Sequence, residues 1–450
     1  MQYNDIRQFN ISVADGVLTD LNKKLELTRL PDELDLPFDQ SWDWGMPLAV
    51  LKPVLDYWRT TYDWRSVEKR INETLPQFTA HVESLSHGLQ EIHFVHKRSD
   101  SETATPLLFI HGWPGSFMEV SKIIDGLTNP TNPKDPAFHV VAPSLPGFAF
   151  SERASTPGMD VIATAFVFDK LMIKLGYKYY IAQGGDWGAR VCRGLALHHQ
   201  ETCVGTHSNL FSYGGPGFWR NPMITLKLIL GGKGLPGGYS GDEMAGVKRM
   251  QEFLSTGNAY MRLQGTRPQA SHSLAHQLLS RLRSEKRHSH MHSQVSAPIA
   301  HSSPDFKQRT DSPIGLLAWI GEKLYAWTDN YPWTPEELVT WTMLYWIQGP
   351  AGGLRFYKEN HITSRGSRTG PHAELEFQWS PTPFGFSYFP KEVAPIPLDW
   401  VGLRQKLVYA KKHNKGGHFA AWEVPGPLSD DIREFTKIVL KNDKRLCLKN

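Results

Sequence analysis

The sequence predicts an α/β protein with a mostly parallel sheet, a helical insertion and a helical segment ahead of the sheet. Short apolar runs at residues 107–110, 140–142 and 179–182 alternate with helical patterns. Buried strands that alternate with helices form βαβ units and parallel sheets. The chain of 450 residues is long enough for one large domain with additions, or for two domains.

Residues 1–100 form an N-terminal leader in this prediction, mostly helical and ending in strands. Apolar residues at near-helical spacing indicate helices over 15–28, 47–62 and 65–74, and alternation indicates a strand over 89–96. We expect the leader to pack on the core or on the cap.

Residues 101–212 form the first part of the α/β core. The three apolar runs are its expected strands, and helices are expected over 161–175 and directly after residue 188. Residues 213–350 break this alternation, because glycine and proline punctuate their start and helical patterns follow. We expect a helical cap here, with helices over 242–253, 258–263, 313–328 and 335–348.

Residues 351–450 are expected to be the second part of the core. Apolar runs indicate strands over 384–389 and 407–412, and a last helix is expected over 429–440.

One stretch of the cap, residues 269–309, differs in composition from the rest. It carries the net positive charge of the chain, and residues 269–303 are rich in histidine and serine. We expect a disordered insertion. The run of His288, His290 and His292 could bind a metal, but the biased composition favours a disordered tract. A translated intron is an alternative origin. We expect no metal and no cofactor.

Composition excludes several classes of protein. The net charge of +4 is too small to indicate a nucleic-acid partner, and three cysteines give no disulfide framework. The polar N-terminus lacks a secretory signal, and no apolar run approaches the roughly 20 residues that span a bilayer. We expect a soluble, cytoplasmic protein without a transmembrane segment. The sequence leaves the oligomeric state open, a homodimer included.

The first candidate site is the segment 184–188 (GGDWG), which follows an apolar run and precedes a helical pattern. This is the setting of a nucleophile elbow, in which small residues flank a nucleophile on a sharp turn. The expected nucleophile is Asp186. A carboxylate that attacks an sp3 carbon leaves an ester, which water can cleave. Asp186 therefore predicts the opening of an epoxide or the displacement of a halide.

The segment 111–116 (HGWPGS) follows another apolar run. Its loop can turn the backbone N–H of Trp113 toward the elbow. Together with the N–H of Trp187, it would form an oxyanion hole for hydrolysis of the ester.

A general base and its orienting acid are expected late in the chain. His418 follows two glycines after the strand over 407–412, and it suits the base that activates water against the ester. Glu392 lies just past the strand over 384–389 and is the preferred acid, with Asp399 as its competitor.

Opening an epoxide also needs a donor that protonates the leaving alkoxide. Tyrosine can supply the proton because its pKa near 10 lies well below that of an alcohol. Tyr260 and Tyr357 are the candidates, although each taken alone has the pattern of a packed aromatic.

These motifs together resemble the epoxide hydrolases of the α/β-hydrolase superfamily, in the microsomal-like branch with its fungal and insect relatives. Further matching stretches are residues 42–45, 75–78, 321–323 and 383–391, so the resemblance covers nearly the whole chain outside residues 269–309. It implies an α/β-hydrolase fold with a helical cap and an N-terminal leader.

The resemblance also implies roles for single residues. Asp186 is the nucleophile, His418 the base, Glu392 the acid, and Tyr260 and Tyr357 the residues that bind the epoxide oxygen. The oxyanion amides are those of Trp113 and Trp187. The family's membrane-bound members carry an N-terminal anchor, which this sequence lacks.

The expected reaction converts an apolar or aryl epoxide to a vicinal diol, with water as the second substrate. One rival is a haloalkane dehalogenase, which shares the aspartate elbow; the cap tyrosines favour the epoxide, since a halide leaves unprotonated. A second rival is a catalytically impaired binding protein, if the stretch at residues 269–303 disrupts the cap.

Overall fold

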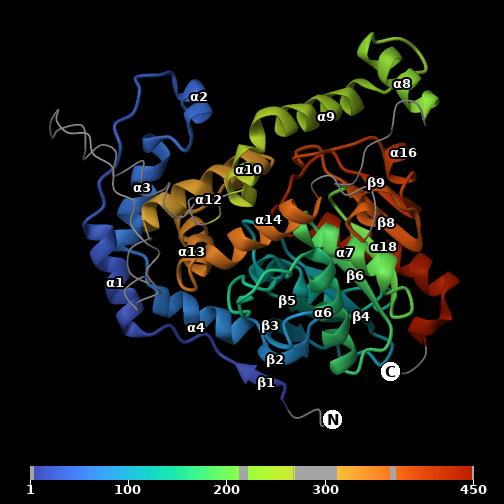
Figure 1. Ribbon diagram of the computed structural model, residues 1–450, viewed down its shortest axis with the longest axis horizontal. Coiled ribbons are helices and arrows are strands. Elements are labelled where there is room, and N and C mark those ends of the chain that lie inside the picture. The colour runs from blue at the N-terminus through green and yellow to red at the C-terminus, as the bar shows by residue number, and fades with distance from the viewer. Residues whose placement is uncertain (1–4, 212–220, 267, 269–311, 365–370, 448–450) are drawn as a thin grey trace, which may run out of the picture.

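The computed structural model describes residues 5–211, 221–266, 268, 312–364 and 371–447. Within these residues, nine strands form one sheet in the order β1-β2-β3-β5-β4-β6-β7-β8-β9 (Figure 1). The strands are β1 (Arg7–Phe9), β2 (Gln77–Glu83), β3 (Leu89–Lys97), β4 (Thr105–Ile110), β5 (Phe138–Pro143), β6 (Tyr180–Gly184), β7 (Cys203–Ser208), β8 (Ser380–Tyr388) and β9 (Gln405–Lys412).

The sheet is parallel from β5 to β9 in sheet order and antiparallel at the edge formed by β1, β2 and β3. Every residue of β4, β6 and β7 is buried, as expected of central parallel strands that helices cover on both faces. The mostly parallel sheet predicted from the apolar runs is therefore confirmed.

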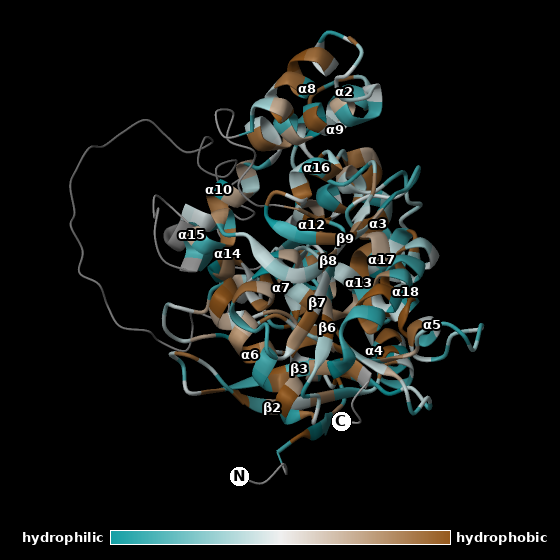
Figure 2. Ribbon diagram, turned by 90° about the vertical axis from the view of Figure 1, so that its right-hand side faces the viewer, coloured by the Kyte–Doolittle hydropathy of each residue, from teal (hydrophilic) through white to brown (hydrophobic). Residues whose placement is uncertain are grey.

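Helices cover both faces of the sheet. α6 (Val161–Lys174) and α7 (Asp186–His198) lie on one side, and α5 (Ile124–Thr128) and α18 (Pro425–Asn442) lie on the other (Figure 2). α6 begins at its expected residue because the side chain of Asp160 accepts hydrogen bonds from two backbone N–H groups of the first turn.

A layer of helices stands over the carboxyl ends of the parallel strands (Figure 1). Its members are α8 (Pro222–Gly232), α9 (Gly241–Glu252), η3 (Phe253–Gly257), α10 (Ala259–Thr266), α12 (Pro313–Trp327), α13 (Pro335–Trp346), α14 (Ala351–Ser364) and α15 (Pro371–Phe377). α14 packs on α10, so the layer continues past residue 350, its expected limit. The stretch over residues 269–309, with its histidine run, lies outside the described residues.

The N-terminal leader contacts both the sheet and the helical layer. Its helices are α1 (Asp15–Glu26), α2 (Phe38–Ser41), η1 (Trp42–Trp44), α3 (Leu48–Thr60) and α4 (Trp64–Thr74). α3 packs on α13 and α1 packs on α12, while β1, β2 and β3 extend the sheet. Among the described helices, none combines the length and the apolar character that crossing a membrane requires.

Candidate active site

Asp186 lies at the sharp turn between β6 and α7, as the elbow motif predicts. It has a φ of +49°, a left-handed conformation that non-glycine residues rarely adopt. The turn is possible because its flanking residues are small. A Cβ on Gly184 would lie 2.5 Å from the carbonyl carbon of Gly188, and a Cβ on Gly188 would lie 2.1 Å from the carbonyl oxygen of Ile110.

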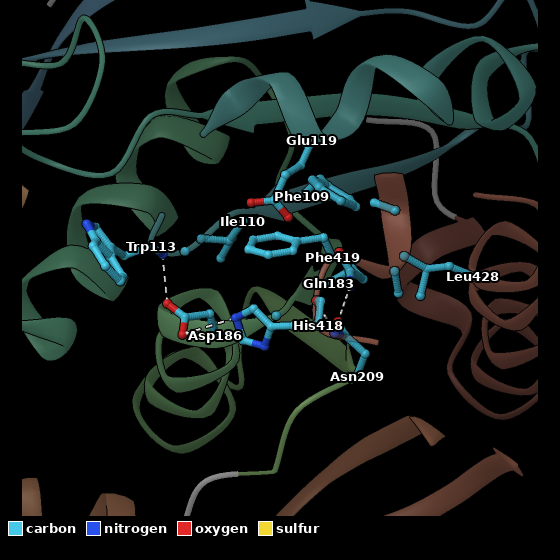
Figure 3. Close-up of a pocket in the computed structure, with 14 residues that line it drawn as sticks. Phe109, Ile110, Trp113, Glu119, Gln183, Asp186, Asn209, His418, Phe419 and Leu428 are labelled. Carbon is cyan, nitrogen blue, oxygen red and sulfur yellow. Dashed lines mark hydrogen bonds and ion pairs between the residues drawn. The ribbon is translucent and has the colours of Figure 1, made fainter. Parts of the chain in front are cut away.

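The loop after β4 holds the carboxylate of Asp186 from the other side. The backbone N–H of Trp113 donates to Oδ1 of Asp186 over 2.8 Å (Figure 3). A Cβ on Gly112 would lie 2.3 Å from the same oxygen, so only glycine permits this approach. Trp187 is the second residue of α7. Its backbone N–H has no acceptor within the helix, as is usual for the first turn. Both expected oxyanion amides therefore lie beside Asp186.

His418 connects the two carboxylates. Its Nε2 lies 3.5 Å from Oδ2 of Asp186, and its Nδ1 lies 2.5 Å from Oε1 of Glu392. The last residue of α12, Trp327, accepts a hydrogen bond of 2.9 Å from the backbone N–H of His418 and packs its ring against the imidazole. The helical layer thus helps to orient the histidine.

Glu392 is the acid that contacts the histidine, and Asp399 is not. The backbone N–H of Val393 donates to Oε1 of Glu392 over 2.6 Å. Asp399 lies elsewhere, where Nζ of Lys227 contacts it at 2.9 Å and the hydroxyl of Tyr239 donates to it over 2.9 Å. Glu392, which the sequence favours over Asp399, is the carboxylate that lies beside the imidazole.

Asn209 is a site residue that the sequence did not indicate. Its side-chain amide donates to Oε2 of Glu392 over 3.3 Å and to the carbonyl oxygen of His418 over 3.2 Å. It follows β7, at the edge where the other site residues end their strands. Its position directly after a strand could have indicated a site residue, but β7 itself was not predicted from the sequence.

The charge on His418 follows from its two acidic neighbours. Burial would lower the pKa of the imidazole, but Glu392 and Asp186 overcome this effect and raise its pKa well above the usual value. The resting site therefore holds an imidazolium between two carboxylates. Because an ester on Asp186 would remove one of these charges, alkylation would lower the pKa of His418 and free it to act as a base.

Tyr260 of α10 and Tyr357 of α14 meet above Asp186. Their rings lie 6.0 Å apart, and the ring of Trp113 stacks on that of Tyr260 at 5.0 Å. The two phenols lie close enough for each to affect the pKa of the other. Burial, with Asp186 nearby, raises the pKa of both hydroxyls well above 10. Both therefore keep their protons at neutral pH and can donate.

A cavity of about 610 Å³ separates Asp186 from the helical layer, within the range of about 300–1,000 Å³ usual for ligand pockets. Tyr260 and Tyr357 line it together with Asp186. Most of its wall is apolar, from side chains that include Leu210, Phe211, Met250, Phe253, Ile396 and Trp400. Asp186, Trp187, Tyr260 and Tyr357 line this cavity. Trp113 and His418 line a smaller cavity that Asp186 also borders, and Glu392 contacts His418.

Within the described residues, no group of three or more His, Cys, Asp or Glu side chains is arranged to hold a metal ion. The site brings together two carboxylates, an imidazole, two phenols and a backbone amide that donates to Asp186.

Two family models match the chain. The model described as "Epoxide hydrolase N terminus" matches residues 6–120, and the model of the alpha/beta hydrolase fold matches residues 105–209. The two matches overlap at residues 105–120 and together run from the leader into the core.

The chain is similar to characterised relatives over nearly its whole length. Epoxide hydrolase 1 of Sus scrofa is 33% identical over 96% of this chain and 88% of the relative. The structure of Aspergillus niger epoxide hydrolase is 31% identical and has a TM-score of 0.74, with 96% of each chain covered. Juvenile hormone epoxide hydrolase of Bombyx mori is 26% identical and has a TM-score of 0.78, with 97% of this chain and 95% of that chain covered.

Proposed function

This chain belongs to the epoxide hydrolase family of the α/β-hydrolase fold, and on that basis we propose that it converts an apolar epoxide to a vicinal diol through a covalent ester on Asp186. The observation that carries the mechanism is the position of the Asp186 carboxylate. It lies at the elbow, within reach of the His418–Glu392 pair, and it lines one cavity with two buried phenols.

In the first step, an oxygen of Asp186 attacks a ring carbon of the epoxide and breaks one C–O bond. Tyr260 and Tyr357 bind the epoxide oxygen, and one phenol donates its proton to the alkoxide that forms. The pair suits this role because both hydroxyls are buried and protonated. A halide would leave without a proton, so the two phenols support an epoxide over a haloalkane substrate.

In the second step, water cleaves the ester. His418 first releases its resting proton to solvent, because the ester has removed the charge of Asp186. It then accepts a proton from the water, whose oxygen attacks Cγ of Asp186, and the Trp113 N–H stabilises the oxyanion. Glu392 holds the imidazole and stabilises its positive charge. Collapse of the intermediate releases the diol and regenerates Asp186. The Asp186 carboxyl group then ionises, and its proton restores the phenol that became a phenolate in the first step.

The cavity indicates the class of substrate. Its wall is mainly apolar. Two charged residues of the wall, Arg190 and Glu376, pair with each other at 2.5 Å, so their charges offset one another. We therefore propose an apolar epoxide, and the volume of about 610 Å³ accommodates an alkyl or aryl group of substantial size.

Conversion of a simple aryl epoxide to its diol tests the proposal, with Asp186→Ala as the inactive variant. We expect the parent protein to form the diol and the variant to lose at least about 10³-fold in kcat. Asp399→Asn is the matched control, since this carboxylate lies outside the site and should be dispensable. Diol formation by a folded Asp186→Ala protein would contradict the assignment of the nucleophile.

A further inference from the structure

Glu119 lies beside the site but has no part in the steps described so far. It belongs to η2 (Phe117–Lys122), the short helix that follows the HGWPGS loop. Its carboxyl group lines a second, much smaller cavity, which Asp186 and His418 also line. Figure 3 shows the Glu119 side chain reaching from its helix toward these two residues.

The loop after β4 fixes the position of this carboxyl group. A Cβ on Gly115 would lie 1.6 Å from Oε1 of Glu119, so the oxygen occupies the space that glycine leaves free. The backbone amide of Gly112 lies close enough to lower the pKa of the same carboxyl group. The hydroxyl of Tyr345 donates to the carbonyl oxygen of Gly115 over 2.6 Å and fixes the loop. The position of Glu119 is therefore set by the segment that also binds Asp186.

The small cavity has a volume of about 10 Å³, close to what the centre of one water molecule requires. Its wall also contains Gln183, which is 1% exposed and whose Oε1 has no hydrogen-bond partner among the described residues. A buried acceptor left unpaired is costly, and ordered water commonly satisfies such groups. Gln183, Glu119, His418 and Asp186 all line this cavity and supply polar groups that a water in it can contact.

The protonation of Glu119 fits contact with this water. Burial raises the pKa of its carboxyl group to about 8, and Asp186 and Glu392 act in the same direction, against the charge of His418 and the Gly112 amide. Tyr345 also lies within electrostatic range. At neutral pH the group is therefore mainly a neutral acid. Its carbonyl oxygen can accept a hydrogen bond without placing a further negative charge beside an oxyanion.

We propose that Glu119 is a further catalytic residue, which together with His418 holds the water that hydrolyses the ester on Asp186. This inference rests on the proposed two-step function. The water donates one hydrogen to Nε2 of His418, to which the proton is transferred, and the other to Glu119 as a hydrogen bond that persists. The water oxygen then bonds to Cγ of Asp186, and the carbonyl electron pair moves to the oxygen beside the Trp113 N–H.

The intermediate then collapses. The carbonyl bond forms again, the bond from Cγ to the alkyl oxygen breaks, and the leaving alkoxide takes the proton from the His418 imidazolium. Glu119 neither gains nor loses a proton. Its contribution is to orient the water, and misplacing a reactant by about 1 Å can cost about 10²-fold in rate.

Single-turnover kinetics with excess enzyme and an aryl epoxide test this role. Intact-protein mass spectrometry follows the formation and decay of the covalent ester, and diol is measured in parallel. In Glu119→Leu we expect ester formation at the parent rate and ester decay slowed by about 10²-fold. The ester should then accumulate, and kcat and KM should fall together. Glu119→Gln keeps a carbonyl acceptor in a neutral group of the same shape, so it should recover most of the lost decay rate.

Other results would contradict the proposed role of Glu119 or the two-step function. Ester formation and decay that both match the parent in Glu119→Leu would overturn the role of Glu119. A matching loss in both steps would assign it a purely structural role, as would a Glu119→Gln protein no better than Glu119→Leu. A parent protein that forms diol without the ester, and an Asp186→Ala variant that does the same, would instead contradict the two-step function and with it this inference.

Discussion

At the scale of single residues, Asp186 has an energetically unfavourable backbone conformation, but this conformation places its carboxylate beside Trp113 and His418. A non-glycine residue at positive φ costs roughly 1–3 kcal/mol. In return, the φ of +49° places the carboxylate against the Trp113 N–H and within 3.5 Å of His418. The surrounding glycines relieve the crowding of the turn around Asp186.

The acid of the site is tested by Glu392→Gln. In the proposed mechanism, hydrolysis of the ester requires a neutral His418, so its rate falls as the pH is lowered and the imidazole is protonated. Removing the Glu392 charge lowers the pKa of His418, and the decline should move to lower pH. The maximal rate should also fall by about 10²–10⁴-fold, because the imidazole loses its orienting partner.

The control for this prediction is Asp399→Asn, which removes a carboxylate that pairs with Lys227 instead. A half-exposed pair of this kind is worth about 0–1 kcal/mol. The pH profile of the rate should therefore match the parent. An unchanged profile in Glu392→Gln, or a shifted one in Asp399→Asn, would contradict the assignment.

The phenols are tested by replacing each with phenylalanine. Tyr260→Phe and Tyr357→Phe should each slow formation of the ester by about 10²–10⁴-fold, because the alkoxide loses a proton donor or its partner. Decay of the ester should be unchanged, since the phenols act only in ring opening. Pre-steady-state measurement of the two steps distinguishes this result from a general loss of structure, which would slow both.

At the scale of elements, the elbow depends on how closely α7 approaches β4. In Gly188→Ala the new Cβ would meet the carbonyl oxygen of Ile110, which cannot move without distorting the strand. We expect a loss of about 1–3 kcal/mol in the free energy of unfolding, together with loss of activity.

Gly16→Ala is the matched control for this prediction. Gly16 lies in the first turn of α1, and a Cβ there meets no described atom within 4 Å. This substitution should be neutral or stabilise by about 0.5–1 kcal/mol. Chemical denaturation of both variants measures the difference. A Gly188→Ala protein of parent stability and activity would contradict the packing argument.

The sequence predicted the elements that have a strong pattern. The apolar runs of β4, β5 and β6 and the apolar spacing of α1, α3, α4, α6 and α13 all gave the correct type of element. β7 was missed because its sequence, CVGTHS, is neither continuously apolar nor alternating, although every residue is buried. α14 was missed because its second and third residues are glycines, which disfavour a helix.

The site was predictable where chemistry and local pattern coincide. The elbow around Asp186 and the glycine-led His418 could be read from short motifs. Glu392 was preferred over Asp399, but spacing alone left both open, because the answer depends on which carboxylate the chain brings to the imidazole. Asn209 and Glu119 were also missed, since their roles arise only when separate loops meet in space.

At the scale of the whole molecule, the leader is part of one structure with the core. Its strands continue the sheet, and α3 packs on α13 of the helical layer. We therefore expect leader and core to unfold together. Trp58 of α3 is 4% exposed, and Trp58→Ala should lower the free energy of unfolding by about 3–5 kcal/mol in a single shifted transition.

Trp44→Ala is the control for this prediction, because Trp44 is 75% exposed and its removal should change stability by no more than about 0.5 kcal/mol. Denaturation followed by circular dichroism, with activity as a second probe, measures both variants. Two separate transitions in Trp58→Ala would show instead that the leader unfolds independently.

A single turnover in H₂¹⁸O, with enzyme in excess over epoxide, tests whether the covalent ester forms on Asp186. In the proposed mechanism water attacks Cγ of Asp186, so the diol takes its new oxygen from the aspartate. Mass spectrometry should find ¹⁶O in both diol oxygens and one ¹⁸O in the peptide that contains Asp186. A diol that carries ¹⁸O after this first turnover, with an unlabelled Asp186, would show that water attacks the epoxide directly and would contradict the account.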